Sequence, residues 1–214
     1  MPESCSLSSL YSAVVCDVLD GLGFRWQALS SCMRPLTRTR RVHGRVFTAR
    51  AVAVTEVPPE PYKLQIAAVD ALTRGDVLVV DGQETRTCAF WGELLTTACV
   101  HKGVHGVVMS ACTRDIWKID ELGFPVFGIG CHPADDKGRL EVVEVGGEIT
   151  IAGVRTKTGD LIIGDEDGVV IIPSEAAPET LRRASEKVAR ENQVRRALAA
   201  GMPLGEAFKR FGIL

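Results

Sequence analysis

The segment Gly75-Asp76-Val77-Leu78-Val79-Val80-Asp81-Gly82 is a short, β-branched apolar run between two glycines, which is typical of a buried strand. Beyond it, residues 93–102 have helical character and stop at Gly103. A second apolar run at 107–109, a short helical segment at 116–122 and a third strand at 125–127 follow. This order predicts a central β-α-β-α-β unit around which the rest of the chain folds.

Acidic and basic side chains stand where the two strand-to-helix turns of this unit should meet. Glu93 opens the first helix, and Arg114 and Asp115 precede the second. In such a unit, ligands bind beyond the carboxyl ends of the strands, where helix N-termini present free N–H groups. Carboxylates suit Mg²⁺ or Mn²⁺, and a guanidinium suits a carboxylate or an enolate. The pattern predicts a crevice for a divalent cation and an oxygen-rich anion.

Each of these three residues also has a purely structural interpretation, and spacing alone favours it. Asp115 could cap the helix that begins at Ile116, Arg114 could be a solvated surface charge, and Glu93 could complement a helix dipole.

The bulk composition indicates one globular domain over residues 1–214. The chain is 46% hydrophobic and 24% charged, and its net charge of −2 gives no general attraction to nucleic acid or to anionic lipid. No apolar run approaches the length of a membrane span, and the first five residues lack the pattern of a signal peptide, so we expect a cytoplasmic protein with no membrane partner. The seven cysteines are scattered without a Cys-x-x-Cys motif, which argues against a disulfide framework or a structural zinc site. Cys112 is the cysteine beside the predicted crevice.

Several other charged or polar groups have a structural interpretation that we prefer. We expect an exposed turn for the arginines between positions 34 and 45, a loop over residues 81–88 that begins with an Asx turn of Asp81 with Gly82, and a hairpin turn for residues 165–168. His101 and His105 are four residues apart, but Gly103 should end the helix between them, so they should not form a metal pair. His132 is expected in a polar loop that could touch the substrate.

Outside the central unit the sequence predicts an N-terminal helix, a strand, another helix, a set of short strands and two C-terminal helices. The segments are 7–22, 46–55, 63–72, then 141–145, 148–151, 160–163 and 169–172, then 174–200 and a last short helix. The charged helix and the apolar tip after it favour a subunit contact for the segment 174–214, although this segment could also pack on its own domain.

Glu93, twenty intervening residues and Arg114-Asp115 resemble the acidic-X20-Arg-Asp signature of the RraA-like family. The resemblance extends to the glycine-flanked strand 75–82, to the segments 124–127 and 159–173, and to the tail 208–214, and therefore spans nearly the whole chain. Enzymatic members of this family are class II pyruvate aldolases that cleave 4-hydroxy-4-methyl-2-oxoglutarate and 4-carboxy-4-hydroxy-2-oxoadipate. Other members are binding proteins that regulate ribonuclease E.

The resemblance implies a β/β/α sandwich with swivelling-domain topology, assembled as a homotrimer or as a pair of trimers. It implies that Asp115 ligates Mg²⁺, Mn²⁺ or another divalent metal, that Glu93 holds metal-bound water, and that Arg114 reaches the C2 oxygen of a 2-oxo acid. Gly92 and the backbone N–H groups of Leu94 and Leu95 would receive the substrate carboxylate.

A further carboxylate would come from a neighbouring subunit, with Glu191 as first choice and Glu186 as second. The implied activity is retro-aldol cleavage of a 4-hydroxy-2-oxo acid to pyruvate, with oxaloacetate decarboxylation through the same enolate. The alternative is a non-catalytic regulator of a ribonuclease. A methyltransferase is disfavoured because no Gly-x-Gly-x-Gly loop follows an early strand.

One departure concerns the residues just before Arg114. This chain has Ser110-Ala111 where family members usually have Asp-Gly. Loss of the glycine is expected to change a turn that shapes the pocket, and with it the choice of substrate.

Overall fold

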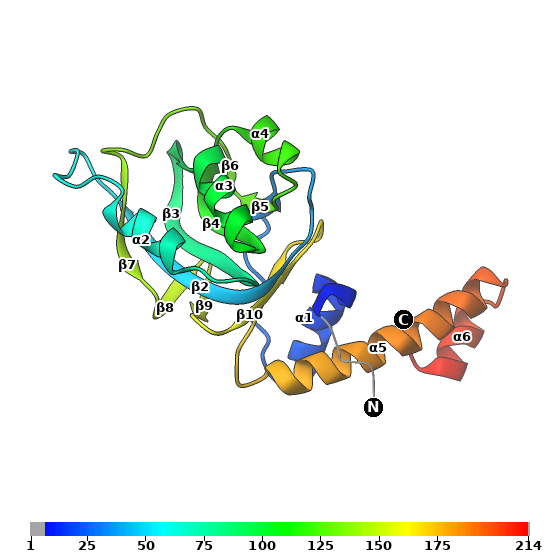
Figure 1. The fold of residues 1–214 in the computed structure, drawn as a ribbon. Helices are drawn as coiled ribbons and strands as arrows, with labels where there is room; N and C mark the ends of the chain where they lie inside the picture. The colour runs from blue at the N-terminus through cyan, green and yellow to red at the C-terminus, as the bar shows by residue number, and fades with distance from the viewer. Residues whose placement is uncertain (1–6, 214) are drawn as a thin grey trace.

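Four parallel strands joined by three helices form the middle of the molecule (Figure 1). The computed structural model describes residues 7–213, so the expectations for the first five residues, Cys5 included, lie outside the described part. The strands are β2 (Val42–Ala53), β3 (Asp76–Trp91), β4 (Gly106–Thr113) and β5 (Val126–Gly128), and the helices between them are α2 (Lys63–Ala71), α3 (Glu93–Lys102) and α4 (Ile116–Glu121). The predicted β-α-β-α-β unit is confirmed, and β2 and α2 extend it by one repeat.

The central strands are buried on both faces, because alternate side chains enter different hydrophobic clusters. In β3, Leu78 and Val80 pack in the cluster that includes α2, α3 and α4, whereas Val77 and Val79 pack in a second cluster on the opposite face. A continuous apolar run is the pattern of such a two-sided strand. Burial of both faces therefore fixes the register of β3 and with it the position of its carboxyl end.

Further strands, most of them antiparallel to their neighbours, extend this core on both sides into a mixed sheet that nearly closes on itself. In the described residues the sheet has nine strands in the order β1-β5-β4-β3-β2-β10-β11, with β6 beside β4 and β7 beside β2. The added strands are β1 (Arg34–Pro35), β6 (Gly130–Cys131), β7 (Leu140–Val145), β10 (Leu161–Gly164) and β11 (Val169–Ile172). A separate hairpin consists of β8 (Glu148–Ile151) and β9 (Val154–Lys157). The α/β class is thus confirmed.

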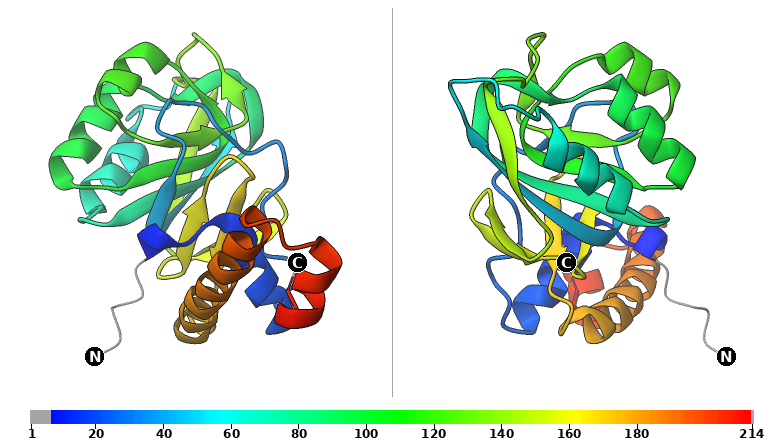
Figure 2. Two further views of the ribbon diagram at one scale, coloured as in Figure 1. Left: turned by 90° about the vertical axis from the view of Figure 1, so that its right-hand side faces the viewer. Right: turned by 60° about the vertical axis from the view of Figure 1, so that its left-hand side comes forward.

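The N-terminal and C-terminal helices pack together away from the central helices (Figures 1 and 2). A short 3₁₀ helix (Leu7–Ser9) leads into α1 (Ser12–Gly21), which packs with α5 (Ala177–Ala199) and the β10–β11 hairpin in a third hydrophobic cluster. Helix α6 (Leu204–Phe211) folds back beside the far end of α5. The helices predicted at 7–22, 63–72 and 174–200 are therefore present with slightly shorter bounds.

Two predictions are wrong in detail, and one strand was missed. The segment 81–88 is not a loop, because β3 continues to Trp91 through register shifts, with Gln83 and Glu84 at positive φ. The arginine run at 34–45 is not one exposed turn, because it contains β1 and the start of β2. Strand β9 was not predicted. In each case the neighbouring strands, rather than the local pattern, supply the backbone partners.

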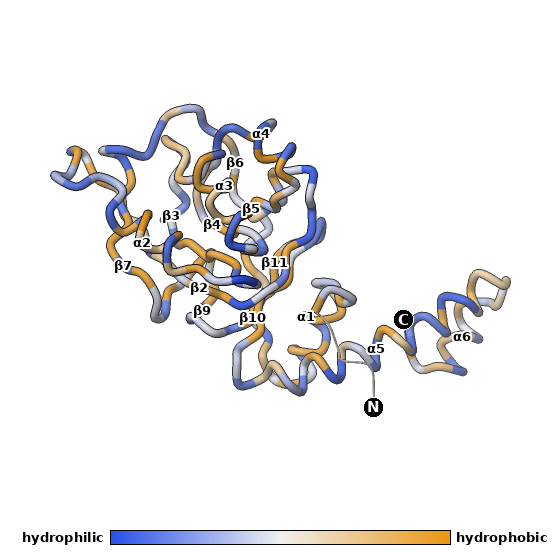
Figure 3. Tube along the Cα trace, in the orientation of Figure 1, coloured by the Kyte–Doolittle hydropathy of each residue, from blue (hydrophilic) through white to orange (hydrophobic). Residues whose placement is uncertain are grey.

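The hydropathy of the residues matches their positions in the sheet and in the helices (Figure 3). Apolar colours concentrate on the sheet, while polar and apolar residues alternate along α5 and α6. Among residues 7–213, none of the helices combines the length and the apolar character needed to span a membrane.

Candidate active site

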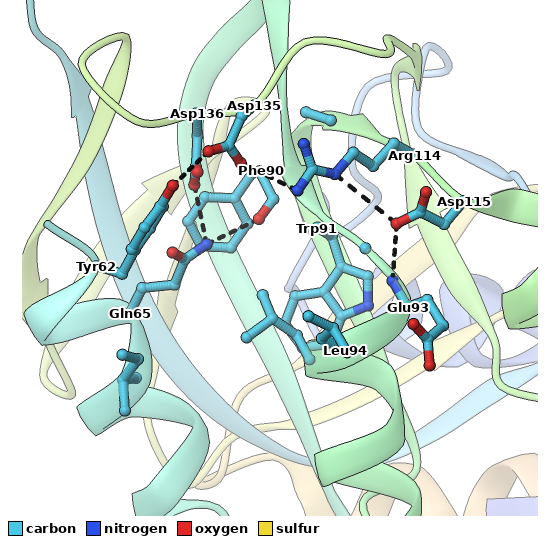
Figure 4. A pocket seen from close by; sticks show the side chains of 14 residues that line it. Tyr62, Gln65, Phe90, Trp91, Glu93, Leu94, Arg114, Asp115, Asp135 and Asp136 are labelled. Atoms are coloured by element: carbon cyan, nitrogen blue, oxygen red, sulfur yellow. Dashed lines mark hydrogen bonds and ion pairs between the residues drawn. The ribbon is translucent and has the colours of Figure 1, made fainter.

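Strands β3 and β4 end side by side, and this brings the two predicted turns together. Trp91, the last residue of β3, pairs with Thr113, the last residue of β4. The N–H of Arg114 donates to the carbonyl of Trp91 at 2.9 Å, and the Thr113 hydroxyl donates to the same carbonyl at 3.1 Å. Glu93 and the Arg114-Asp115 pair consequently line one cavity of about 310 Å³, as the sequence predicts (Figure 4).

Asp115 is held in an unusual backbone conformation with its carboxylate turned toward α3. Its φ of 60° lies in the left-handed region, which is costly for most residues but is tolerated by aspartate. Its Oδ2 accepts the N–H of Glu93 at 3.3 Å, and the side chain makes no capping bond to α4. Asp115 therefore occupies the N-cap position of α4, but its side chain does not cap that helix and its carboxylate lines the cavity instead.

Gly92 allows the Asp115 carboxylate to approach the start of α3 because it has no side chain. A Cβ atom at Gly92 would lie 2.9 Å from Oδ2 of Asp115 and 3.4 Å from Cγ of Arg114. The backbone of Gly92 is extended, so its conformation alone does not require glycine. Glycine is needed here for space.

Arg114 is not a solvated surface charge, because carboxylates hold its guanidinium on two sides. Nε lies 3.7 Å from Oδ2 of Asp115, and Nη2 lies 3.1 Å from Oδ1 of Asp135. The side chain is 37% exposed and lines the cavity. This arrangement fixes the plane of the guanidinium at the mouth of the pocket.

Glu93 and the first turn of α3 form the next part of the wall. Glu93 accepts a hydrogen bond from the Thr97 hydroxyl at 3.0 Å, and its other oxygen lies 4.0 Å from Nζ of Lys118. The N–H groups of Leu94 and Leu95 belong to the first turn, where helix N–H groups lack intrahelical partners. The start of α3 can therefore receive an anion, as predicted for Leu94 and Leu95.

The pocket residues that were not predicted from the sequence include Tyr62, Gln65, Asp135 and Asp136. The Tyr62 hydroxyl donates to Asp135, and Gln65 Nε2 donates to Asp136 at 3.0 Å and to the carbonyl of Phe90 at 2.8 Å. The available signal was the pair of adjacent aspartates in the loop that follows the third strand of the central unit. Tyr62 and Gln65 carry no such signal, because only the packing of α2 brings them to the cavity.

Burial and nearby charges shift the pKa values of the neighbouring Asp135 and Asp136 in opposite directions. Burial, together with the charge of Asp135, raises the pKa of Asp136 to about 7. Burial also pushes the pKa of Asp135 upward, but the hydrogen bond from Tyr62 and the charge of Arg114 outweigh it and leave that pKa below its usual value. Burial and the bond to Asp135 raise the pKa of Tyr62 to about 12. The pocket thus contains one firmly ionised carboxylate beside one that can hold a proton near neutral pH.

The donor set is compatible with a hydrated divalent ion but not with an all-protein metal cage. Among residues 7–213, no three or more His, Cys, Asp or Glu side chains are grouped so that they could hold a metal. Asp115 and Glu93 offer carboxylate oxygens only, and Mg²⁺ is commonly bound by one or two carboxylates while it keeps several waters. These two residues therefore fit a magnesium-like ion whose remaining ligands are water and substrate.

The residues expected to act from a neighbouring subunit lie on α5, away from this cavity. Glu191 accepts a hydrogen bond from the hydroxyl of Tyr11 and lies 3.9 Å from Nζ of Lys187. Glu186 pairs with Arg182 at 2.7 Å. Neither lines the pocket of its own chain, so either could contribute to such a pocket only in another copy.

Ser110-Ala111 does not form a turn, so the expectation of a turn at this position is wrong. Both residues are buried inside β4, where Ser110 Oγ accepts the N–H of Gly82 at 2.8 Å and donates to Asp81 at 3.2 Å. Asp81 also accepts the N–H of Gln83 at 3.1 Å, which is the bond of the predicted Asx turn. This pair stabilises the junction of two strands and does not line the cavity.

The remaining candidates lie around the site rather than in it. Cys112 is buried, and burial raises the pKa of its thiol. His132 lines a more open cavity on the other side of Arg114 and Asp115, and its Nδ1 accepts the N–H of Ala134 at 3.1 Å. Helix α3 ends at Lys102 before a left-handed Gly103, so His105 lies beyond the helix that contains His101, as predicted, and its ring lies against His43 with 5.4 Å between ring centroids.

Several known proteins are similar to this chain in sequence or in structure. Protein DlpA of Legionella pneumophila is 26% identical over 92% of this chain, which spans only 31% of the length of that protein. A protein of Halalkalibacterium halodurans, provisionally named a 4-hydroxy-4-methyl-2-oxoglutarate aldolase, is 29% identical over 86% of this chain and 83% of its own. RraAS2 of Streptomyces coelicolor, described as an unusual member of the RNase ES inhibitor RraA family, superposes with a TM-score of 0.80 at 28% identity, covering 89% of this chain and 94% of its own.

A family model also matches this chain, over the part that contains the site. The RraA-like model, described as Aldolase/RraA, matches residues 12–171, a span that holds the whole cavity lining. The chain therefore belongs to the RraA-like family.

Proposed function

We propose that this protein is a divalent-metal-dependent lyase that cleaves a 4-hydroxy-2-oxo acid to pyruvate and also decarboxylates oxaloacetate. The observation that carries the proposal is the convergence of Glu93, Arg114 and Asp115 at the paired ends of β3 and β4. The family match and the aldolase names of relatives point to the same reaction class.

The reaction needs stabilisation of one developing charge. When the C3–C4 bond of the substrate breaks, its electron pair passes into a pyruvate enolate. The guanidinium of Arg114, fixed by Asp115 and Asp135, would face the C2 oxygen where that charge develops. The N–H groups at the start of α3 would hold the C1 carboxylate, so that the reacting atoms are positioned before the bond breaks.

A proton must leave the C4 hydroxyl at the same time. Glu93 would position a water that accepts this proton, and the enolate is then protonated at C3 to give pyruvate. Asp115 and Glu93 would hold the divalent ion, whose contribution when bound is Lewis-acid stabilisation of the 2-oxo and carboxylate oxygens. No lysine lines the cavity among the described residues, so the wall offers no amine for a Schiff base.

The direct test is pyruvate release from a panel of 4-hydroxy-2-oxo acids and oxaloacetate, with Mg²⁺ or with EDTA. We expect Mg²⁺-dependent release that EDTA abolishes. We also expect Asp115→Asn and Arg114→Ala each to lower kcat/KM by about 100-fold or more, the scale on which a lost charge-stabilising donor acts. Asp20→Asn, which changes an exposed aspartate of α1, is the matched control and should retain full activity. A metal-independent rate, or full activity in both site variants, would refute the proposal.

Regulation of a ribonuclease is the second candidate, and the superposition on RraAS2 favours it. A regulator acts through its surface, so it would bind its partner without needing the Arg114-Asp115 pair. Capture of a ribonuclease by the wild type and by Asp115→Asn alike, with no turnover of any 2-oxo acid, would favour this candidate over the lyase.

A further inference from the structure

The pocket has two sides that differ in chemistry, and the proposed reaction uses only one of them (Figure 4). Arg114, Asp115 and Glu93 lie on one side, at the start of α3. Tyr62 and Gln65, from the start of α2, lie on the opposite side, which we call the α2 side. If the 2-oxo acid end of a substrate binds to Arg114 and α3, the rest of the substrate must extend toward the α2 side.

The α2 side offers no positive charge. Among the described residues that line the cavity, Arg114 is the single cation, and it is already paired with Asp115 and Asp135. Asp135 and Asp136 add two more carboxyl groups between Arg114 and α2. A carboxylate carried as a substituent on C4 would reach this side and meet like charge without a cation to offset it, whereas the carboxylate that oxaloacetate loses is C4 itself and lies beside C3.

The α2 side also has few hydrogen-bond donors to spare. Gln65 Nε2 has two hydrogens, and both are used, one by the carbonyl of Phe90 and one by Asp136. The Tyr62 hydroxyl donates its hydrogen to Asp135. These donors serve protein acceptors, so a carboxylate arriving from solvent would lose its hydration with little to replace it.

The remaining lining of the pocket is apolar. Side chains of Ile66, Ala89, Phe90, Leu94 and Leu95 contribute to it. Ile66 lies on α2 and is 51% exposed, and Leu94 lies on α3 and is 80% exposed, so apolar surface from two helices is available to cover a ligand. Such surface favours an alkyl or aryl group over a charged one. A cavity of about 310 Å³ is at the small end for ligand sites, which favours a short substituent.

We infer that the C4 substituent of the substrate is uncharged and mainly apolar, so that cleavage yields pyruvate and an aldehyde rather than pyruvate and a second 2-oxo acid. This inference rests on the proposed lyase function and narrows its substrate class. The reaction balances without another reactant: the C3–C4 bond breaks, the C4 hydroxyl loses its proton and becomes the aldehyde carbonyl, and C3 gains a proton. The class differs from 4-hydroxy-4-methyl-2-oxoglutarate, which carries a carboxylate on this part of the molecule.

Binding can test the inference without any turnover. 2-Oxopentanoate and 2-oxoglutarate have chains of equal length and differ by a methyl group in place of a carboxylate. In calorimetric titrations of the full chain with Mg²⁺ present, we expect 2-oxopentanoate to bind at least about tenfold more tightly. Equal or tighter binding of 2-oxoglutarate, or no binding of 2-oxopentanoate, would overturn the inference.

A charge introduced on the α2 side should reverse the preference. Ile66→Lys places an ammonium on the half-exposed face of α2, and Ile66→Gln is a neutral control of similar length. Relative to the glutamine variant, the lysine variant should bind 2-oxoglutarate at least about tenfold more tightly and 2-oxopentanoate about equally. Equal affinities of the two variants for 2-oxoglutarate would count against the assignment of the α2 side to the substituent.

Turnover separates failure of this inference from failure of the lyase proposal. 4-Hydroxy-2-oxopentanoate should release pyruvate with a higher kcat/KM than 4-hydroxy-2-oxoglutarate. Faster cleavage of the glutarate would overturn the inference and uphold the lyase. Absence of pyruvate from both would refute the lyase, and the calorimetric order would still decide what the α2 side binds.

Discussion

At the scale of single residues, the site depends on a few side chains held in conditions that are unfavourable elsewhere. Asp115 has a left-handed backbone, Gly92 leaves just enough space for the Asp115 carboxylate, and Asp136 is a carboxyl group with 4% exposure. Strained or desolvated groups of this kind persist where the surrounding structure determines them, and they cluster at functional sites. Substitution of any one of these residues should therefore have an effect that can be measured.

Asp136 should make the stability of the protein depend on pH. Its pKa of about 7 lies above the value near 4 expected in an unfolded chain, so the folded state binds the proton more tightly. Its contribution to stability is therefore lost as pH rises from about 4 through 7. Its carboxyl group accepts a hydrogen bond from Gln65, and the titratable groups that interact with it are Asp135, Tyr62 and Cys88.

Asp136→Asn removes this effect and can still accept the hydrogen bond from Gln65. The stability of the variant relative to the wild type should rise by roughly 1–3 kcal/mol between pH 4 and pH 8, measured by urea denaturation at several pH values. The exposed control Asp20→Asn should show no such trend. A pH-independent difference would show that the pKa of Asp136 is the same in the folded and unfolded states.

Gly92→Ala should damage the site while leaving the fold intact. The new methyl group would lie 2.9 Å from Oδ2 of Asp115 and would displace the Asp115 carboxylate. Misplacement of catalytic groups on this scale lowers kcat/KM by about 10- to 100-fold. The free energy of unfolding should change little, because an extended backbone accepts alanine. Gly205→Ala, where an added Cβ meets nothing within 4 Å, is the matched control, and equal activity of the two variants would contradict this account.

At the scale of secondary-structure elements, single hydrogen-bond networks join segments that are far apart in the chain. Asp165, in the turn between β10 and β11, accepts the N–H of Ser12 at 2.7 Å and the Ser12 hydroxyl at 2.6 Å. It thereby supplies the cap for the first turn of α1 that the preceding residue, Tyr11, does not provide. The predicted hairpin turn is confirmed, and it anchors the N-terminal helix.

Asp165→Ala should therefore destabilise the protein without changing catalysis. The variant leaves the buried N–H and hydroxyl of Ser12 without an acceptor, which costs about 1–3 kcal/mol in urea denaturation. Glu166→Ala changes the exposed neighbouring acid and should cost less than about 0.5 kcal/mol. Similar losses in both variants would show that the turn as a whole, not the cap, is responsible.

At the scale of the whole molecule, the C-terminal helices carry apolar side chains that their own chain leaves exposed. On α6, Leu204 is 56% exposed and Phe208 is 50% exposed, at the end of the molecule where α5 and α6 extend away from the sheet (Figure 1). Large apolar side chains in such a position favour contact with another copy. This agrees with the subunit contact expected for residues 174–214.

We predict a homo-oligomer that Phe208→Ser weakens. Light scattering should give the wild type a mass of at least three times the 23.1 kDa of one chain, as expected for a trimer. Phe208→Ser should lower that mass, whereas Lys209→Ser, on the same helix, should not. If Glu191 acts in a neighbouring copy, activity should fall together with the mass. A monomeric wild type with full activity would exclude a role for Glu191 across a subunit contact.

The sequence by itself determined the parts of the fold that depend on neighbouring residues. Helix α3 has the bounds Glu93–Lys102 and a left-handed Gly103 after it, because an apolar helix and a glycine stop are local features. The strand–helix alternation also placed Glu93 and Arg114 at one sheet edge, since parallel strands present their carboxyl ends together.

Only the tertiary structure decided the features that depend on distant partners. The continuation of β3 through Gln83 and Glu84 is set by its pairing with β4, and the gathering of Tyr62, Gln65, Asp135 and Asp136 is set by the packing of α2 against the loop after β6. These residues have no periodicity relative to Arg114 in the sequence. Their contacts form only when the sheet closes. Burial and hydrogen bonding between remote segments then select one arrangement, which the conformational preferences of neighbouring residues do not determine.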